Sequence, residues 1–437
     1  MAENLTHKRI LNIAFPIVLS NATVPILGAV DTGVIGQLGE AAPIGAVGIG
    51  AIILSSLYWI FGFLRMGTTG LAAQAIGAKD HEETSALLMR ALLIGIGAGF
   101  VIILLQIPLY WFAFKLAPAS VEVEALARTY LQIRVFSAPA AIALYSITGW
   151  LIAHERTRAV LVLQLWMNGL NIALDLLFVL QLGWGVEGVA IATFIAEWTG
   201  LGLGLWLARF GFVNGLWRNW GQIFDRLKLR HMAMVNGDIM LRSVMLQAAF
   251  TSFLFLGARF GDVTLAANQV LLQFMYITAY AMDGFAYAAE ALIGQALGAR
   301  NLATFRRSVY LCSFWSVMSV FLMTFAFWVF GGWMIDVMTT APDVRTEARS
   351  YLPWMVLAPL TGVACWMLDG IFIGATRSAD MRNMMLISVG GYIVALFLLL
   401  APFGNHGLWA SMNLFFIARG VTLGWKYPAL EASIERA

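Results

Sequence analysis

Long apolar stretches, separated by short polar interruptions, make up almost the whole chain. About 20 mostly apolar residues are enough to cross the hydrocarbon core of a bilayer as a helix. The pattern therefore predicts an all-α integral membrane protein with twelve spanning helices. These lie near residues 10–36, 43–73, 84–111, 122–153, 158–181, 187–209, 231–257, 263–296, 304–330, 345–374, 380–402 and 407–426.

The second half of the chain repeats motifs of the first half. Gln74-Ala75-Ile76-Gly77-Ala78-Lys79 returns half a chain later as Gln295-Ala296-Leu297-Gly298-Ala299-Arg300. The same offset in numbering relates Gly149, Ile152 and Arg156 to Gly370, Ile373 and Arg377, and a slightly smaller offset relates Gly185 and Gly188 to Gly404 and Gly407. Duplicated bundles of this kind are typical of secondary transporters, whose two halves move about a central site.

The repeat predicts two six-helix lobes around a central cleft, with an N-terminal lobe over 1–210 and a C-terminal lobe over 231–437. Residues 211–230 form the longest polar interruption, which is rich in Arg and Trp and is predicted to be a cytoplasmic linker. Six spans in each half give both halves the same orientation, so the repeat is parallel. Basic residues gather at the N-terminus, in the even-numbered loops and at the C-terminal end. The positive-inside rule then predicts that both termini are cytoplasmic.

Composition excludes several classes of protein. Hydrophobic residues make up 60% of the chain and charged residues 12%, so the net charge of +3 is a sign of membrane topology and predicts no nucleic-acid partner. Cys312 and Cys365 stand alone in apolar stretches, and no zinc or phosphate-loop motif is present in the sequence. We therefore expect that the protein is not an enzyme and holds no resident metal or cofactor. We expect it to carry out transport driven by an ion gradient.

Two carboxylates lie within predicted spans of the first half. Asn168, Asn171 and Asp175 fall on one face of the fifth span, Asp31 lies in the first, and Thr193 lies in the sixth. Carboxylate, amide and hydroxyl oxygens together suit a proton or Na⁺. A structural polar cluster is the alternative, with Arg65 or Arg134 pairing with Asp31. Glu197 is interpreted as a structural charge.

Pro16 and Pro25 share the first span with Asp31, and each removes a helical hydrogen bond. They predict either static kinks or a bend that changes during transport. In the second half, Asp238 and Arg242 have the spacing of an intrahelical ion pair. Together with Asp283 and Asp369 they predict a polar network that either binds substrate or fastens the lobe. The buried charges are interpreted as mostly acidic.

The repeated Gln-Ala-x-Gly-Ala motif, Val30-Asp31-Thr32 and Asn171-Ile172-Ala173-Leu174-Asp175 resemble the multidrug and toxic compound extrusion (MATE) transporters, and within them the DNA-damage-inducible F type. The second half adds Asn236-Gly237-Asp238-Ile239-Met240-Leu241-Arg242, Leu265-Ala266-Ala267-Asn268, Asp283-Gly284-Phe285-Ala286 and the run from Leu368 to Arg377. The resemblance covers essentially the whole chain.

This resemblance implies export of amphipathic, often cationic compounds in exchange for H⁺ or Na⁺ by alternating access. It implies an ion site at Asp31, Asn171, Asp175 and Thr193, and a bend at Pro16. It also suggests a monomer in the bacterial inner membrane. The alternatives are a flippase of lipid-linked intermediates, which needs basic residues in its cavity, and a narrow-specificity metabolite exporter.

Overall fold

The computed structural model describes residues 5–37, 39–116 and 120–435, and these residues form helices joined by short connections, with no strand among them. Among these described residues, ten helical stretches are long and apolar enough to cross a membrane. They are His7–Gly36, Ala41–Gly77, His81–Leu104, Val121–Ala153, Thr157–Gln181, Gly185–Leu207, Arg226–Phe260, Leu302–Met338, Pro342–Gly374 and Ser378–Glu435. They match the predicted spans closely.

The two remaining spans are explained by α12 and α15. Helix α12 (Asp262–Gly298) is 37 residues long, which is enough to cross a bilayer, and it carries Asp283 and Glu290. Helix α15 (Ser378–Glu435) consists of two helices that meet at Gly404, where φ is 54°. Counting α12 and dividing α15 at this kink gives the predicted twelve.

The chain divides into two compact units. The N-terminal unit comprises Leu19–Ile76 and Asp80–His231, and the C-terminal unit comprises Met1–Val18, Gly77–Lys79 and Met232–Ala437. The division falls inside two continuous helices, α1 (His7–Gly36) and α11 (Arg226–Gly257). The first turns of each helix therefore belong to a different unit from the rest of it.

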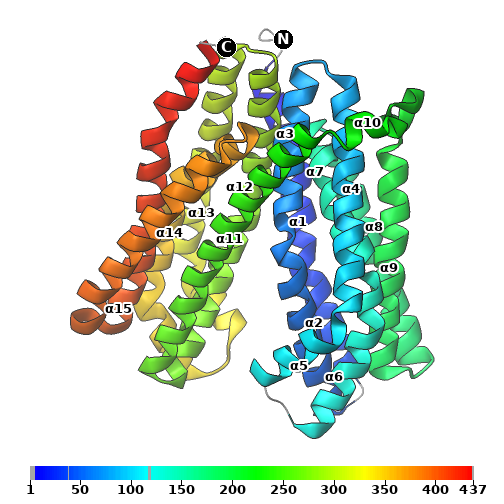
Figure 1. Ribbon diagram of the computed structural model, residues 1–437. Helices are drawn as coiled ribbons and strands as arrows, with labels where there is room; N and C mark the ends of the chain where they lie inside the picture. The colour runs from blue at the N-terminus through cyan, green and yellow to red at the C-terminus, as the bar shows by residue number, and fades with distance from the viewer. Residues whose placement is uncertain (1–4, 38, 117–119, 436–437) are drawn as a thin grey trace. The chain divides into compact units, whose positions relative to one another are not determined.

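The N-terminal unit contains most of α1 and the helices up to α10 (Figure 1). These are α2 (Ala41–Ile60), α3 (Gly62–Gly77), α4 (His81–Leu104), α5 (Gln106–Leu116), α6 (Val121–Arg134), η2 (Val135–Ser137), α7 (Ala138–Ala153), α8 (Thr157–Asp175), η3 (Leu176–Gln181), α9 (Gly185–Leu207), η4 (Arg209–Arg218) and α10 (Trp220–Ile223). Helices α4 and α7 pack closely at Gly99, which has no side chain to hold them apart. A Cβ on Gly99 would lie 2.3 Å from the Pro139 backbone. The Gly95-x-x-x-Gly99 motif thus serves helix packing.

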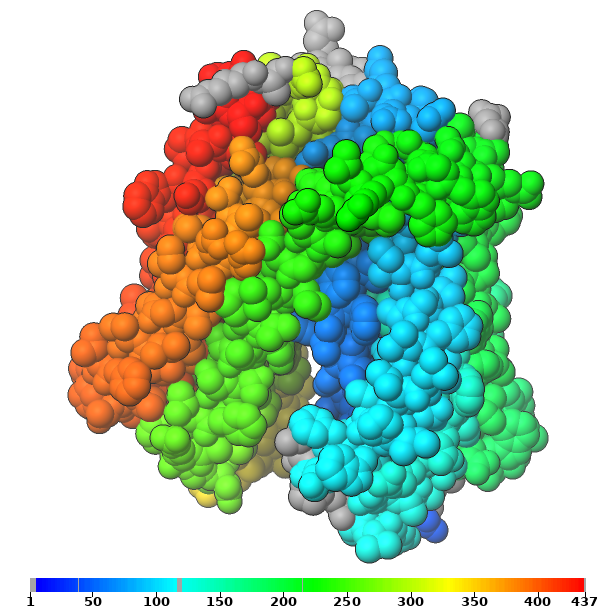
Figure 2. Space-filling model, viewed as in Figure 1, coloured from blue at the N-terminus to red at the C-terminus, as the bar shows by residue number. Residues whose placement is uncertain are grey.

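The segment after α9 lies against the N-terminal unit. Arg90 on α4 donates from Nε to the Ile223 carbonyl oxygen (2.8 Å) and from Nη2 to that of Gln222 (2.6 Å). Lys228 and Arg90 both pair with Glu83, at 2.6 Å each. Figure 2 shows this green segment across the end of the cyan helix α4. The polar stretch between the halves is therefore helical and fixed to α4.

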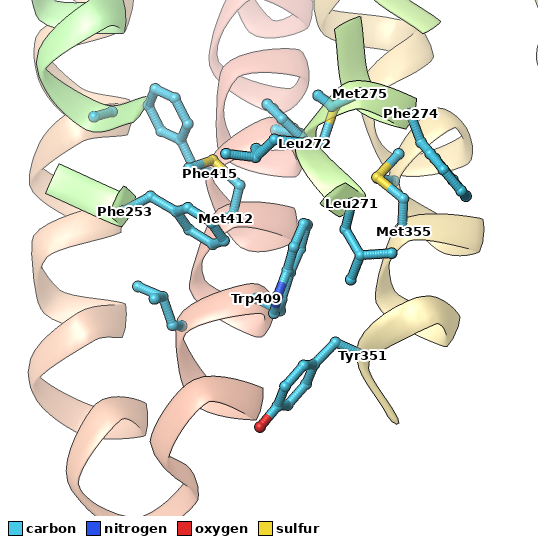
Figure 3. Packing of buried hydrophobic residues seen from close by; sticks show 14 of the residues in the cluster. Phe253, Leu271, Leu272, Phe274, Met275, Tyr351, Met355, Trp409, Met412 and Phe415 are labelled. Carbon is cyan, nitrogen blue, oxygen red and sulfur yellow. The ribbon is translucent and has the colours of Figure 1, made fainter. Parts of the chain in front are cut away.

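The C-terminal unit is built from α11, α12, α13 (Leu302–Met338), α14 (Pro342–Gly374) and α15, joined by η5 (Ala258–Phe260). Its core gathers aromatic side chains and methionines around Trp409 (Figure 3). The Phe253 and Trp409 rings meet edge to face with centroids 4.8 Å apart. Asn268 accepts from Trp409 Nε1 (2.9 Å), so the buried indole N–H is satisfied.

The repeat seen in the sequence is also present in the backbone. Glu155 and Thr376, which occupy corresponding positions of the two halves, both have positive φ, at 59° and 51°. Gly185 and Gly404, another corresponding pair, share a φ of 54°. Corresponding turns in the two halves therefore have the same local conformation.

Candidate ion-coupling site

Four predicted residues meet inside the N-terminal unit. Asn171 and Asp175 lie one turn apart on α8, Asp31 lies on α1, and Thr193 lies on α9. With its amide nitrogen toward the acids, Asn171 donates to Asp31 Oδ1 (3.1 Å) and Asp175 Oδ2 (3.2 Å). Its amide oxygen then accepts from the Thr193 hydroxyl (2.9 Å) and backbone N–H (3.2 Å). One amide thus joins both carboxyl groups to α9.

Burial makes this arrangement chemically unusual. Asp175 is 0% exposed and Asn171 1%, while Asp31 and Thr193 are half-buried. Asp175 Oδ1 has no hydrogen-bond partner within the described chain. Two carboxyl groups held beside one amide can share a proton or offer oxygen ligands to a small cation.

Helix α8 changes form directly after Asp175. Leu176–Gln181 follows it as a π-helix, designated η3. Such segments are rare, often occur at functional sites, and widen the backbone relative to an α-helix. Asp175 therefore stands where the α-helical geometry of this span ends.

Asn168 has a different role from its helical neighbours. Its Nδ2 donates to Thr23 Oγ1 on α1 (2.7 Å), and its Oδ1 accepts from Gln164 Nε2 (2.9 Å). The predicted common face is therefore divided, with Asn168 fastening α1 to α8 while Asn171 joins the acids. Sequence reasoning did not single out Thr23 or Gln164, although the one-turn spacing of Gln164 and Asn168 was visible.

Arg134, proposed from the sequence as a partner of Asp31, forms its ion pair with Glu197. Arg134 Nη1 and Nη2 donate to the two Glu197 carboxylate oxygens at 2.6 and 3.2 Å. Nη1 also donates to the Ser137 hydroxyl at 2.7 Å. Glu197 thus has the structural role expected of it, and it occupies both terminal nitrogens of Arg134.

The two candidate hinge prolines lie on α1. Pro16 is buried and belongs to the part of α1 in the C-terminal unit, whereas Pro25 is exposed and belongs to the part in the N-terminal unit. They stand on either side of the division between Val18 and Leu19.

The residues predicted for the second lobe pair differently from the expectation. Asp238 and Arg242 form no ion pair with each other in the described residues, because each has a partner on another helix. Asp238 accepts from Arg382 Nη1 (2.5 Å) and Ser378 Oγ (3.0 Å). Arg242 pairs with Asp369 on α14. Asp283 lies half-buried on α12 beside Tyr280.

Arg419 was missed by the sequence analysis. It lies on α15 and donates from Nη2 to Asp369 Oδ2 at 2.5 Å. Its partner on α14 is 50 residues away in the chain, so no periodicity could reveal the contact.

The interpretation of the buried charges as mostly acidic is wrong. In the described chain, buried charged residues include five arginines and three acids. They are Arg65, Arg90, Arg134, Arg242, Arg419, Asp175, Glu290 and Asp369. Several of these arginines satisfy acids or backbone carbonyl groups, which the sequence alone does not show.

Comparisons with known proteins agree with this architecture. The family model described as MatE matches residues 16–177 and 239–399. The chain is 40% identical to DNA damage-inducible protein F of Escherichia coli, over 96% of this chain and 91% of that protein. It is 25% identical to the probable multidrug resistance protein NorM of Pseudomonas aeruginosa, over 96% and 89%.

The fold is also that of a solved transporter. The Vibrio cholerae MATE transporter VcmN, in its bent form, superimposes with a TM-score of 0.87 at 22% identity, covering 98% of this chain and 97% of that one. The resemblance stated from the sequence is therefore confirmed at the level of both family and fold. This chain is a multi-pass membrane protein that belongs to the MatE family, the MATE transporters of multidrug efflux, and is a transporter rather than an enzyme.

Proposed function

We propose that the protein is a secondary active antiporter, which exports amphipathic, often cationic compounds in exchange for H⁺, or alternatively Na⁺. The observation that carries this proposal is the Asp31–Asn171–Asp175 arrangement, with two carboxyl groups joined by one amide inside the N-terminal unit. The ion pair between Arg134 and Glu197 supports the proposal, because it engages the arginine that the sequence offered as a partner for Asp31.

In the proposed cycle, ion uptake at Asp31 and Asp175 neutralises the pair and changes its hydrogen bonds to Asn171. Because Asp31 and both prolines share α1, the change is transmitted to the bend of that helix. Pro16 and Pro25 act as the hinge. Ion and substrate then favour different conformations of one two-state protein, which is the thermodynamic requirement for exchange.

The proposal includes a place and an assembly for the transporter. We infer that it acts as a monomer in the bacterial inner membrane, with both termini in the cytoplasm. The identity to the E. coli protein supports the bacterial inner membrane, and the sorting of basic residues by side supports cytoplasmic termini.

The test is dye export from proteoliposomes under a pH gradient alone and under a Na⁺ gradient alone. Wild type is compared with Asp31→Asn and Asp175→Asn, and Asp343→Asn is the matched control because it removes an exposed acid at the start of α14. We expect transport under one gradient, lost in both site variants and kept in the control. Full transport by Asp175→Asn would remove this site from the mechanism, while no gradient-driven transport of several cationic dyes would favour a flippase or a narrow metabolite exporter.

A further inference from the structure

A buried cluster of three charges joins three helices of the C-terminal unit. Asp369 on α14 accepts at Oδ2 from Arg242 on α11 and from Arg419 on α15, the latter at 2.5 Å. Exposure is 7% for Asp369, 5% for Arg242 and 3% for Arg419. These residues are thus almost completely withdrawn from solvent.

The cluster carries more positive than negative charge. Arginine stays protonated in proteins, so two guanidinium groups face one carboxylate. Asp238, the nearest acid along α11, is already engaged by Arg382 and Ser378. The Phe415 ring lies 5.6 Å from the Arg419 guanidinium and supplies a cation–π contact without any formal charge. One positive charge of the cluster is therefore not balanced by Asp369.

Hydrogen-bonding capacity is also left over. Within the described chain, Nε of Arg242, Nε of Arg419 and Oδ1 of Asp369 are buried and have no hydrogen-bond partner. Unbalanced buried charge and unused buried donors are both costly, and one arginine would have been enough to pair with Asp369. A purely structural cluster does not explain the second arginine.

We propose that Arg242 and Arg419 bind an anionic oxygen group, a carboxylate or a phosphate, of the transported molecule. Guanidinium groups match the geometry of both anions, and Asp369 holds the two side chains in place between the helices. This inference rests on the proposed transport function and adds to its substrate class. Among the exported compounds are amphipathic molecules that carry an anionic group, zwitterions included.

The test measures binding rather than transport, so that it is separate from the test of antiport. Purified protein in uncharged detergent is titrated with a rhodamine that has a free carboxylate and with the ethyl ester of the same rhodamine, using fluorescence polarisation. Wild type should bind the carboxylate form more tightly. Arg419→Gln should reduce this preference about tenfold, the size expected for one charge-assisted hydrogen bond. Asp369→Asn, which keeps both arginines and removes the competing negative charge, should increase it.

Arg306→Gln is the matched control, since it removes an arginine of the same unit whose side chain is 58% exposed and pairs with Glu431. Equal binding of the two dyes by wild type would overturn the proposal, as would an equal loss of preference in Arg419→Gln and Arg306→Gln. If Arg419→Gln does not fold, the opposite shift in Asp369→Asn still decides the question, and a reduced preference there would also overturn it.

Competition distinguishes the sources of the anion. Displacement of the carboxylate dye by dihexanoyl phosphatidic acid, but not by dihexanoyl phosphatidylcholine or inorganic phosphate, would support the anion site and assign it to a lipid phosphate. Displacement by inorganic phosphate would support a site for free anions. A dye preference with no displacement by either phosphate would support the site and restrict it to carboxylates. The antiport proposal is tested independently of these binding results. It fails if dye export does not respond to an ion gradient.

Discussion

Lys79 and Arg300 adopt the same left-handed backbone conformation, with φ of 59° and 51°, although they lie in opposite halves of the chain. Each follows a helix that ends in the repeated motif. The next residue closes the same turn in both copies, because the N–H of Asp80 donates to Ala75 and that of Asn301 to Ala296, each at 2.9 Å. Asp80 and Asn301 then cap α4 and α13 by accepting from Glu83 and Thr304.

The first prediction concerns the strain at Lys79. A residue other than glycine costs roughly 1–2 kcal/mol in this conformation, and a β-branched residue is still less compatible with it. Lys79→Gly should therefore be at least as stable as wild type, and Lys79→Val should be less stable by about 2 kcal/mol. Thermal unfolding in detergent measures both. The control is Lys426→Val within α15, and an equal loss there would show that the turn is not responsible.

The second prediction concerns the buried pair of Arg134 and Glu197, whose side chains are 9% and 13% exposed. Glu197→Gln leaves a buried arginine without its counter-ion and should destabilise the protein by about 3–5 kcal/mol. The double variant Arg134→Met with Glu197→Leu should recover most of this loss. Thermal unfolding of Arg134→Met, of Glu197→Leu and of the double variant forms the double-mutant cycle. Purely additive losses would mean that the pair is not coupled.

The third prediction is that His154 makes the stability of the fold depend on pH. Burial beside Trp150 and Phe210, whose ring centroids lie 4.0 and 5.0 Å away, lowers the pKa of His154 from 6.5 to about 4, while a hydrogen bond to the Trp150 carbonyl only partly opposes this. The folded state therefore favours the neutral ring. The stability that this contributes is complete above pH 6.5 and is lost as the pH falls toward 4.

The measurement compares melting temperatures at pH 7.5 and pH 5. His154→Phe keeps the stacked ring but cannot take up a proton, so it should lose less stability on acidification than wild type, by about 2 kcal/mol at pH 5. His231→Phe, which replaces an exposed histidine, serves as the control. Identical acid sensitivity of His154→Phe and wild type would contradict the prediction.

The fourth prediction tests the proposed hinge. Pro16→Ala restores a helical N–H to α1 and removes the clash of the ring with the preceding turn, so it should favour a straight helix. We expect dye transport to slow about tenfold, equivalent to about 1.4 kcal/mol in the barrier, with no loss of thermal stability. Pro359→Ala, at another buried proline inside α14, is the control and should leave transport nearly unchanged. Unchanged transport by Pro16→Ala would exclude Pro16 as the hinge.

The helices and their repeat could be predicted from the sequence because both depend on local information. Apolar length determines where a chain can cross a bilayer, and the repeated Gly185 and Gly404 mark turns that need left-handed backbone. The candidate ion site could also be predicted from the sequence, since Asn171 and Asp175 are separated by one helical turn and therefore share a face.

The pairing of charges between helices could not be predicted in the same way. Arg242, Asp369 and Arg419 come from three helices that are 50 or more residues apart, and their contact depends on how the helices pack. The Asp238–Arg242 spacing suggested a local pair, but Arg382 and Asp369 offer each residue a partner on a neighbouring helix. Spacing along one helix shows which pairs are possible and does not rank them against partners from elsewhere.

The division of α1 and α11 between the two compact units has a consequence for the origin of the fold. The first turns of α1 group with the second half of the chain, where Arg307 binds the Leu5 carbonyl, and the first turns of α11 group with the first half, where Lys228 binds Glu83. These two segments overlap when one half is aligned onto the other by the repeated motif. A pair of half-length ancestors would thus have exchanged their leading segments in a domain-swapped dimer, and gene fusion would have made that reciprocal exchange permanent within one chain.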